Sequence, residues 1–144
     1  TAKLLQPLPW SPLQRVELLQ VPTTRIEHEL SIFMEDTVQP FEGKLEEYVR
    51  AAGSHYAAEL GVHKREGRSL LELQAAFRPL FGSHRRREVV LWQKITQPAG
   101  LMALLMREIS PDFVRPGAWM HDALVLRDQW HSKLLRAVSW SPCW

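Results

Sequence analysis

Cysteine is almost absent from this sequence of 144 residues, and the single copy, Cys143, lies next to the C-terminus. One thiol cannot form an intramolecular disulfide or a cysteine-based zinc site. We therefore do not expect a secreted, disulfide-stapled scaffold, and the reducing cytoplasm is the expected compartment. Cys143 is also a poor candidate nucleophile, because a nucleophile needs a fixed base beside it and the tail around Cys143 reads as irregular.

Long apolar runs are missing as well. The longest, such as Leu101 to Met106, are far too short to span a bilayer, and the N-terminus lacks the apolar stretch of a signal peptide. The sequence also contains no phosphate-cradling glycine loop, no GxSxG elbow and no HExxH motif. These absences predict a protein that makes no membrane contact, holds no cofactor or metal, and is not an enzyme.

The remaining composition is ordinary for a soluble globular chain, with 45% hydrophobic and 24% charged residues. This length fits one domain with a single core. The sequence shows no fixed repeat and no linker long enough to divide it. We therefore expect one domain over residues 1–144.

Apolar residues recur at helical spacing along most of the chain. Two capping boxes, Thr24 with Glu27 and Ser69 with Glu72, open two of the expected helices. A helix from Ser83 is also expected, although the β-branched pair at 89–90 makes a strand possible there. The prediction is all-α: a compact bundle of roughly six to eight helices, with an extended arm at 1–10 and an irregular, Trp-rich tail at 139–144. The apolar stripes that carry it span 26–38, 41–56, 70–77 and 119–134.

Positive charge is concentrated in the middle of the chain. Residues 61–95 hold eight basic and three acidic side chains, a net of +5, whereas the whole chain carries only +2. A local field of this kind bears on the choice of partner and not on the fold.

The segment from Tyr56 to Val62 resembles the centre of a DNA-binding helix-turn-helix, with Ala57 and Gly61 at that motif's spacing. The resemblance implies a recognition helix that exposes three basic side chains to the major groove. Gly67 departs from the motif, because it stands where that helix should bury an aliphatic side chain. The alternative is that Gly61 caps one helix and residues 62–68 form a solvated loop. The three basic side chains are Lys64, Arg65 and Arg68.

A second basic element is the run from Arg85 through Arg86 to Arg87, with Lys94 a few residues later. On a helix, consecutive arginines fan over nearly a full turn, so at least one faces solvent. Together with the preceding basic residues they form a candidate phosphate-binding patch, since each phosphate contact releases a condensed counterion. The alternative is a solvated face paired with acidic residues.

Two other groups are weaker candidates. His55, Glu59 and His63 would share one face of an unbroken helix, but no second ligand set completes four metal ligands, so we predict no metal site. Trp140 and Trp144 could anchor a protein partner, or the tail could fold back on its own core.

The sequence therefore predicts a non-catalytic nucleic-acid-binding or accessory subunit that contacts the phosphate backbone of DNA or RNA. The alternative is a protein–protein adaptor or assembly subunit that uses apolar helices and the Trp-rich tail. Neither reading distinguishes DNA from RNA or identifies a protein partner. The candidate nucleic-acid contacts are Lys64, Arg65, Arg68, Arg85, Arg86, Arg87 and Lys94, and the candidate partner contacts are Trp140 and Trp144.

Overall fold

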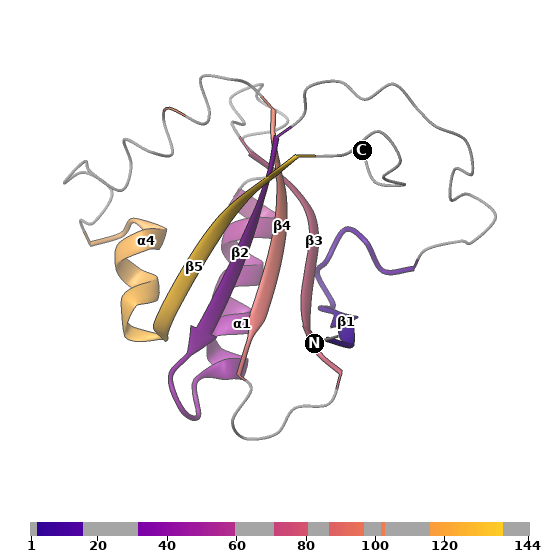
Figure 1. Cartoon of the computed structure of the whole chain (residues 1–144). Helices are drawn as coiled ribbons and strands as arrows, with labels where there is room; N and C mark the ends of the chain where they lie inside the picture. The colour runs from indigo at the N-terminus through magenta and orange to yellow at the C-terminus, as the bar shows by residue number, and fades with distance from the viewer. Residues whose placement is uncertain are drawn as a thin grey trace, which may run out of the picture.

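The computed structural model of the chain describes residues 3–15, 32–59, 71–80, 87–96, 102 and 116–136. Its centre is a five-stranded sheet in which every neighbouring pair of strands runs antiparallel. In spatial order the strands are β1, β3, β4, β2 and β5 (Figure 1). Their bounds are Leu5–Pro7 (β1), Ile32–Pro40 (β2), Leu71–Pro79 (β3), Val89–Ile95 (β4) and Arg127–Arg136 (β5).

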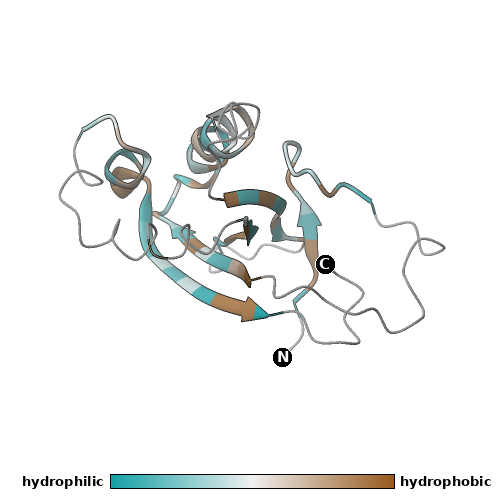
Figure 2. Cartoon of the chain, turned by 90° about the horizontal axis from the view of Figure 1, so that it is seen from above, coloured by the Kyte–Doolittle hydropathy of each residue, from teal (hydrophilic) through white to brown (hydrophobic). Residues whose placement is uncertain are grey.

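Short helices cover one side of this sheet. Helix α1 spans Leu45–Gly53 and continues as a π-helix, η2, over Ser54–Glu59. A one-turn helix, α4, spans Trp119–Asp122 and passes through a 3-10 turn, η4, at Ala123–Val125 into β5. Figure 2 shows α1 and α4 on the same side of the sheet. No helix in the described part of the chain is both long and apolar enough to cross a membrane.

The all-α prediction is wrong, because four of the segments expected to be helical contain strands. The stripe at 26–38 had apolar residues four and eight positions apart, and those offsets fit a strand's period of two as well as a helix. In β2 the alternate residues Met34, Asp36 and Val38 are buried on the helix side. The polar Asp36 interrupted the alternation that would have revealed the strand.

A bulge hid the period of β3. Its pairing with β4 shifts register between Leu73 and Ala75, so the core residues Leu73 and Ala76 are three positions apart, as they would be on a helix. The apparent capping box at Ser69 and Glu72 therefore opens no helix, since Glu72 lies inside the strand.

The other two strands, β4 and β5, differ in how well the sequence predicted them. The strand alternative at 89–90 is the correct one, because β4 begins at Val89. The C-terminal stripe becomes a helix only over Trp119–Asp122 and is a strand from Arg127 onward. Along β5 nearly every side chain is exposed, so its sequence carries little apolar pattern of either period.

The stripe at 41–56 is the one whose helical prediction is confirmed. Tyr48, Val49 and Ala52 are the buried residues of α1, with Glu46 and Glu47 in the first turn where the helix dipole favours acidic groups. These apolar side chains pack on the sheet in a cluster with Val38, Leu73, Ala76, Val89 and Leu91.

The N-terminal arm is tied to this core. As expected, it is extended, and part of it is the edge strand β1. Leu8 is fully buried, and Ser11 accepts a hydrogen bond through its hydroxyl oxygen from the Ala76 backbone N–H at 2.9 Å. The Trp10 indole donates to the backbone oxygen of Val49 in α1 at 3.0 Å, so the arm closes one end of the helix–sheet interface.

Candidate functional site

Three polar side chains cross the helix side of the sheet on adjacent strands. They are Gln93 on β4, Asp36 on β2 and Ser132 on β5, and we call them the polar row. The Gln93 amide donates to Asp36 Oδ2 at 2.7 Å, and the Ser132 hydroxyl donates to Asp36 Oδ1. Asp36 and Gln93 are each 1% exposed, whereas Ser132 is exposed. The row therefore runs from the interior to the surface.

The polar row separates two apolar clusters. Val38 and Leu91 belong to the large cluster under α1. Met34 and Ile95, two positions further along the same faces of β2 and β4, belong to a second cluster with Leu71. A continuous apolar face would have suited the core, so the polar row is a local departure from the pattern that builds the fold.

Burial raises the pKa of the Asp36 carboxyl above its ordinary value, because the charged form loses its hydration. Hydrogen bonds from Ser132, Trp130 and Gln93 and the charge of Arg127 oppose that effect without cancelling it. Asp36 is thus a carboxyl group with three donors around it and a raised proton affinity.

The Gln93 amide is only half satisfied. Its nitrogen bonds Asp36, while its oxygen, Oε1, has no hydrogen-bond partner among the described residues. The two ends of an amide are assigned from their surroundings, and turning the group would leave the NH₂ end without a partner instead. In either orientation one end of this buried amide therefore has no partner in the part of the chain that the structure describes, at a cost of about 1–3 kcal/mol.

Aromatic rings pack in and against the large apolar cluster on the helix side. We call Tyr48, His55, Tyr56 and Trp119 the aromatic cluster. The His55 ring stacks on the Trp119 ring with centroids 5.0 Å apart and planes 8° apart. The Tyr56 and Tyr48 rings lie 5.8 and 5.9 Å from Trp119. The Trp119 indole nitrogen is buried and also has no partner among the described residues.

Tyr48 connects the aromatic cluster to the row. Burial raises the pKa of its phenol well above the ordinary value, and smaller effects come from Tyr56, Arg127 and Asp36. Tyr48 is buried in the cluster that includes Val38 and Leu91, which lie two positions from Asp36 and Gln93 on β2 and β4. His55 and Tyr56 are placed there by the π-helix η2, a distortion that often occurs at functional sites.

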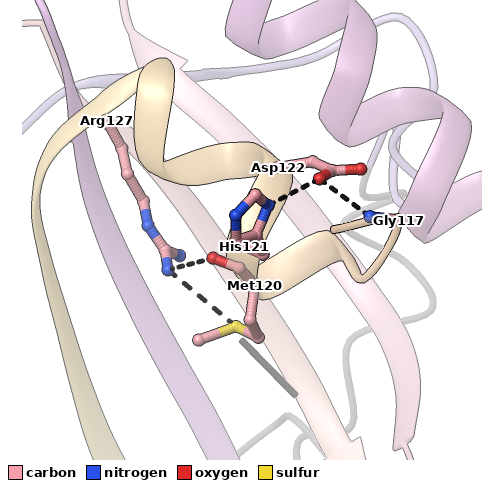
Figure 3. Close-up of polar contacts among 5 residues, drawn as sticks. All are labelled: Gly117, Met120, His121, Asp122 and Arg127. Carbon is pink, nitrogen blue, oxygen red and sulfur yellow. Dashed lines mark hydrogen bonds and ion pairs between the residues drawn. The ribbon is translucent and has the colours of Figure 1, made fainter. Parts of the chain in front are cut away.

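Arg127 fastens α4 to the edge of this region. Its Nη2 donates to the Met120 backbone oxygen at 3.2 Å (Figure 3). The same guanidinium lies 4.8 Å from the Trp130 ring centroid. Asp122 closes the same turn by accepting from the Gly117 N–H at 3.1 Å and contacting His121 Nδ1 at 2.9 Å. These two contacts lower the pKa of Asp122, the His121 contact having the larger effect. Trp119, at the start of α4, is thereby held over α1.

Most of the predicted contact residues lie outside the described part of the chain. Arg87 is described and lies just before β4, with Nη1 3.7 Å from Glu42 Oε2. Lys94 lies near the other end of β4, opposite Phe33 of β2 and Glu72 of β3. The two lie seven positions apart, which along an extended backbone is ~23 Å, so these two side chains do not form one compact patch. The predicted contacts outside the described residues are Lys64, Arg65, Arg68, Arg85, Arg86, Trp140 and Trp144.

The other sequence motifs are placed only in part. Tyr56 and Ala57, from the helix-turn-helix resemblance, lie in η2, and the rest of that motif falls outside the described residues. His55, from the partial metal set, packs on Trp119, and His63 is not described. No group of three metal-ligating side chains occurs within the described ranges.

Sequence reasoning missed the polar row altogether. Its members are far apart in the chain, because Gln93 lies 57 positions and Ser132 lies 96 positions after Asp36. One signal was present: Asp36 and Gln93 each stand at an apolar phase of a strand, between Met34 and Val38 and between Leu91 and Ile95. That signal becomes readable only once these segments are recognised as strands.

No family model matches the chain, and no curated protein is significantly similar to it. The structure is similar to the crystal structure of an uncharacterised NIPSNAP domain protein from Burkholderia xenovorans, with a TM-score of 0.54. The match has 14% sequence identity and covers 77% of this chain and 98% of that one. At this identity the similarity concerns the fold. A sheet-based fold of this kind overturns both the helical nucleic-acid-binding subunit and the adaptor built on apolar helices.

Proposed function

We propose that the domain binds a small, uncharged organic molecule at the polar row and the aromatic cluster. The observation that carries this proposal is the half-satisfied amide of Gln93, 1% exposed and bonded to the buried carboxyl of Asp36. An unpaired polar group in an interior is costly, and a ligand that pairs with it recovers that cost on binding.

The surroundings indicate what kind of molecule fits. The unpaired end of Gln93 needs a donor or an acceptor, depending on how the amide is turned, and the buried Trp119 indole nitrogen needs an acceptor. A carboxamide or a hydroxyl group supplies both. A flat ring on the same molecule can pack against Trp119 or Trp130, which are both only partly buried.

A carboxylate fits less well. It would offer only acceptors and would bring a negative charge beside Asp36, whose carboxyl is already poorly hydrated. We therefore expect preference for neutral ligands. The proposal is for binding without catalysis, as the absence of catalytic motifs led us to expect.

Titration with benzamide, followed through the indole N–H signals in ¹H–¹⁵N spectra, tests this proposal. Trp119 and Trp130 should shift and saturate in the millimolar range, a free energy of about −4 kcal/mol. Trp92 bonds Glu35 on the opposite side of the sheet at 3.0 Å and should not move. Benzoate should bind at least about tenfold more weakly, since it lacks the donor and carries the charge.

Two variants make the test specific. Gln93→Met keeps the side-chain length and removes the amide, so the benzamide shifts should disappear. Thr37→Val is the matched control, because Thr37 lies on β2 beside Asp36 but points to the other face of the sheet. Benzamide shifts that persist unchanged in folded Gln93→Met, or no shift of Trp119 and Trp130 in the wild type, would overturn the proposal and leave the row as a structural network.

A further inference from the structure

We propose that the outer edge of β5 pairs antiparallel with β5 of a second copy of this chain, across a two-fold axis at Ser132. β5 stands at the end of the strand order, so no described strand pairs with its outer edge. The strand is ten residues long, and most of its side chains are exposed. A long edge with unpaired backbone groups is a template for another strand.

Charged side chains commonly protect edge strands against pairing with other chains. The charged side chains of β5 do not give this protection. Arg127 is 8% exposed and turned under α4 toward Met120. Lys133 lies 3.6 Å from Glu35 of the neighbouring strand, so its charge is compensated within the same sheet. The exposed charges that remain are Asp128 at one end and Arg136 at the other. The edge therefore has one negative and one positive end, so it is complementary in charge to the same edge of a second copy that runs in the opposite direction.

Backbone geometry restricts the register of such a pairing. Alternate residues of a strand direct their N–H and C=O groups outward, so paired positions must both be even-numbered or both odd-numbered. Centring the pair on Ser132 places Asp128 opposite Arg136 twice and Trp130 opposite Leu134 twice. Trp130 and Leu134 lie on the helix side, since they pair with Val38 and Met34 of β2. Centring it on Lys133 would set two lysines against each other, and centring it on His131 would leave Asp128 opposite Leu134.

The apolar contacts favour the same register. Leu134 is 54% exposed, and Trp130 is only partly buried. Cross-strand aromatic–aliphatic and opposite-charge pairs each stabilise a sheet by about 0.2–1 kcal/mol. The pairing ends at Asp128, beside the bulge where β5 shifts register against Pro40 of β2. A two-fold axis perpendicular to the sheet keeps both helical layers on one side, the side that carries α1 and α4 in Figure 2.

Charge reversal tests this register directly by sedimentation equilibrium. Wild-type protein should dimerise. Asp128→Arg alone and Arg136→Asp alone each create two like-charge pairs, and each should weaken the dimer about ten- to a hundredfold. An equimolar mixture of the two variants should recover a heterodimer, since one chain is then positive and the other negative at both positions. The double variant, with both charges exchanged, should dimerise as the wild type does.

The matched control is Arg50→Asp, a charge reversal on an exposed residue of α1, which should leave association unchanged. Circular dichroism of each variant confirms that it is folded. A monomeric wild type at about 100 μM, where β-strand pairing of this size should be detectable, would overturn the proposal. So would single variants that dimerise undiminished, which would assign association to another surface, or a mixture that fails to associate.

Discussion

Replacing Gly53 by alanine tests how the N-terminal arm is packed against α1. A Cβ at this position would lie 2.7 Å from Trp10 Cδ1 and 2.8 Å from Trp10 Nε1. The indole cannot simply move aside, because its N–H donates to the Val49 backbone oxygen at 3.0 Å. The added methyl group must therefore displace the ring and weaken that hydrogen bond, which together cost about 1–3 kcal/mol.

The opposing effect is helix propensity. Alanine in place of glycine at a helical position stabilises the helix by about 1 kcal/mol. In wild-type protein the clash should exceed or cancel this gain. In a Trp10→Ala background the clash is gone, and Gly53→Ala should then stabilise the protein by about 0.5–1 kcal/mol.

The measurement is a double-mutant cycle from urea unfolding of the wild type, both single variants and the double variant. We expect a coupling free energy of about 1–3 kcal/mol between the two positions. Equal effects of Gly53→Ala in the two backgrounds would show that Trp10 does not lie on Gly53. A more stable Gly53→Ala in the wild-type background would refute the close contact outright.

Three further predictions follow from burial and charge. Leu91 is fully buried, so Leu91→Ala should lower the free energy of unfolding by about 2–5 kcal/mol, whereas exposed Gln129→Ala should change it by less than about 0.5. Trp130→Ala should cost about 1–3 kcal/mol, below the 3–5 of a fully buried ring, because the ring is only partly covered; a cost above that range would mean that it is core. For Asp36 the folded-state pKa is raised, so its stabilising contribution is complete below the ordinary value of 3.8 and is lost as pH rises through the folded pKa. Melting temperatures from pH 3 to 7 should therefore shift in favour of Asp36→Asn as pH increases, and a shift in the opposite direction would show that folding lowers the pKa of this carboxyl.

The sequence predicted an element correctly only where its apolar residues follow one period, that of a helix or that of a strand, without a break. In α1 the offsets from Leu45 to Tyr48, Val49 and Ala52 are three, four and seven, which no strand reproduces. In β2 the offset of four from Met34 to Val38 satisfies both periods. Asp36 lies between these two residues, and an apolar residue at this position would have indicated a strand. Because Asp36 is polar, the local pattern assigns it to the solvent-exposed face of a helix.

The candidate site was harder to predict than the fold because it exists only through long-range pairing. Asp36 meets Gln93 and Ser132 because β2 lies between β4 and β5, and no local pattern specifies that strand order. The concentration of positive charge at 61–95 was real in composition, but the two predicted contact residues that the structure describes lie far apart. Arg87 and Lys94 show why: on a strand, seven residues extend more than twice as far as on a helix.

The two proposals meet at Ser132, and this has a thermodynamic consequence. Ser132 is the exposed end of the polar row and also the proposed centre of the β5 pairing, so two rows would end at one axis. A ligand that binds the row would then sit beside the second copy, and its affinity should differ between monomer and dimer. Dimerisation should change the affinity for benzamide by some factor. By linkage, benzamide must change the affinity for the second chain by the same factor per site.

The monomeric Asp128→Arg variant isolates the first factor, because Asp128 lies four residues from Ser132 and is not part of the row. Sedimentation of wild-type protein with and without saturating benzamide gives the second. Factors that differ from one would show that the two events are coupled, as a shared axis requires, whereas factors of one would show that the row and the strand edge act independently.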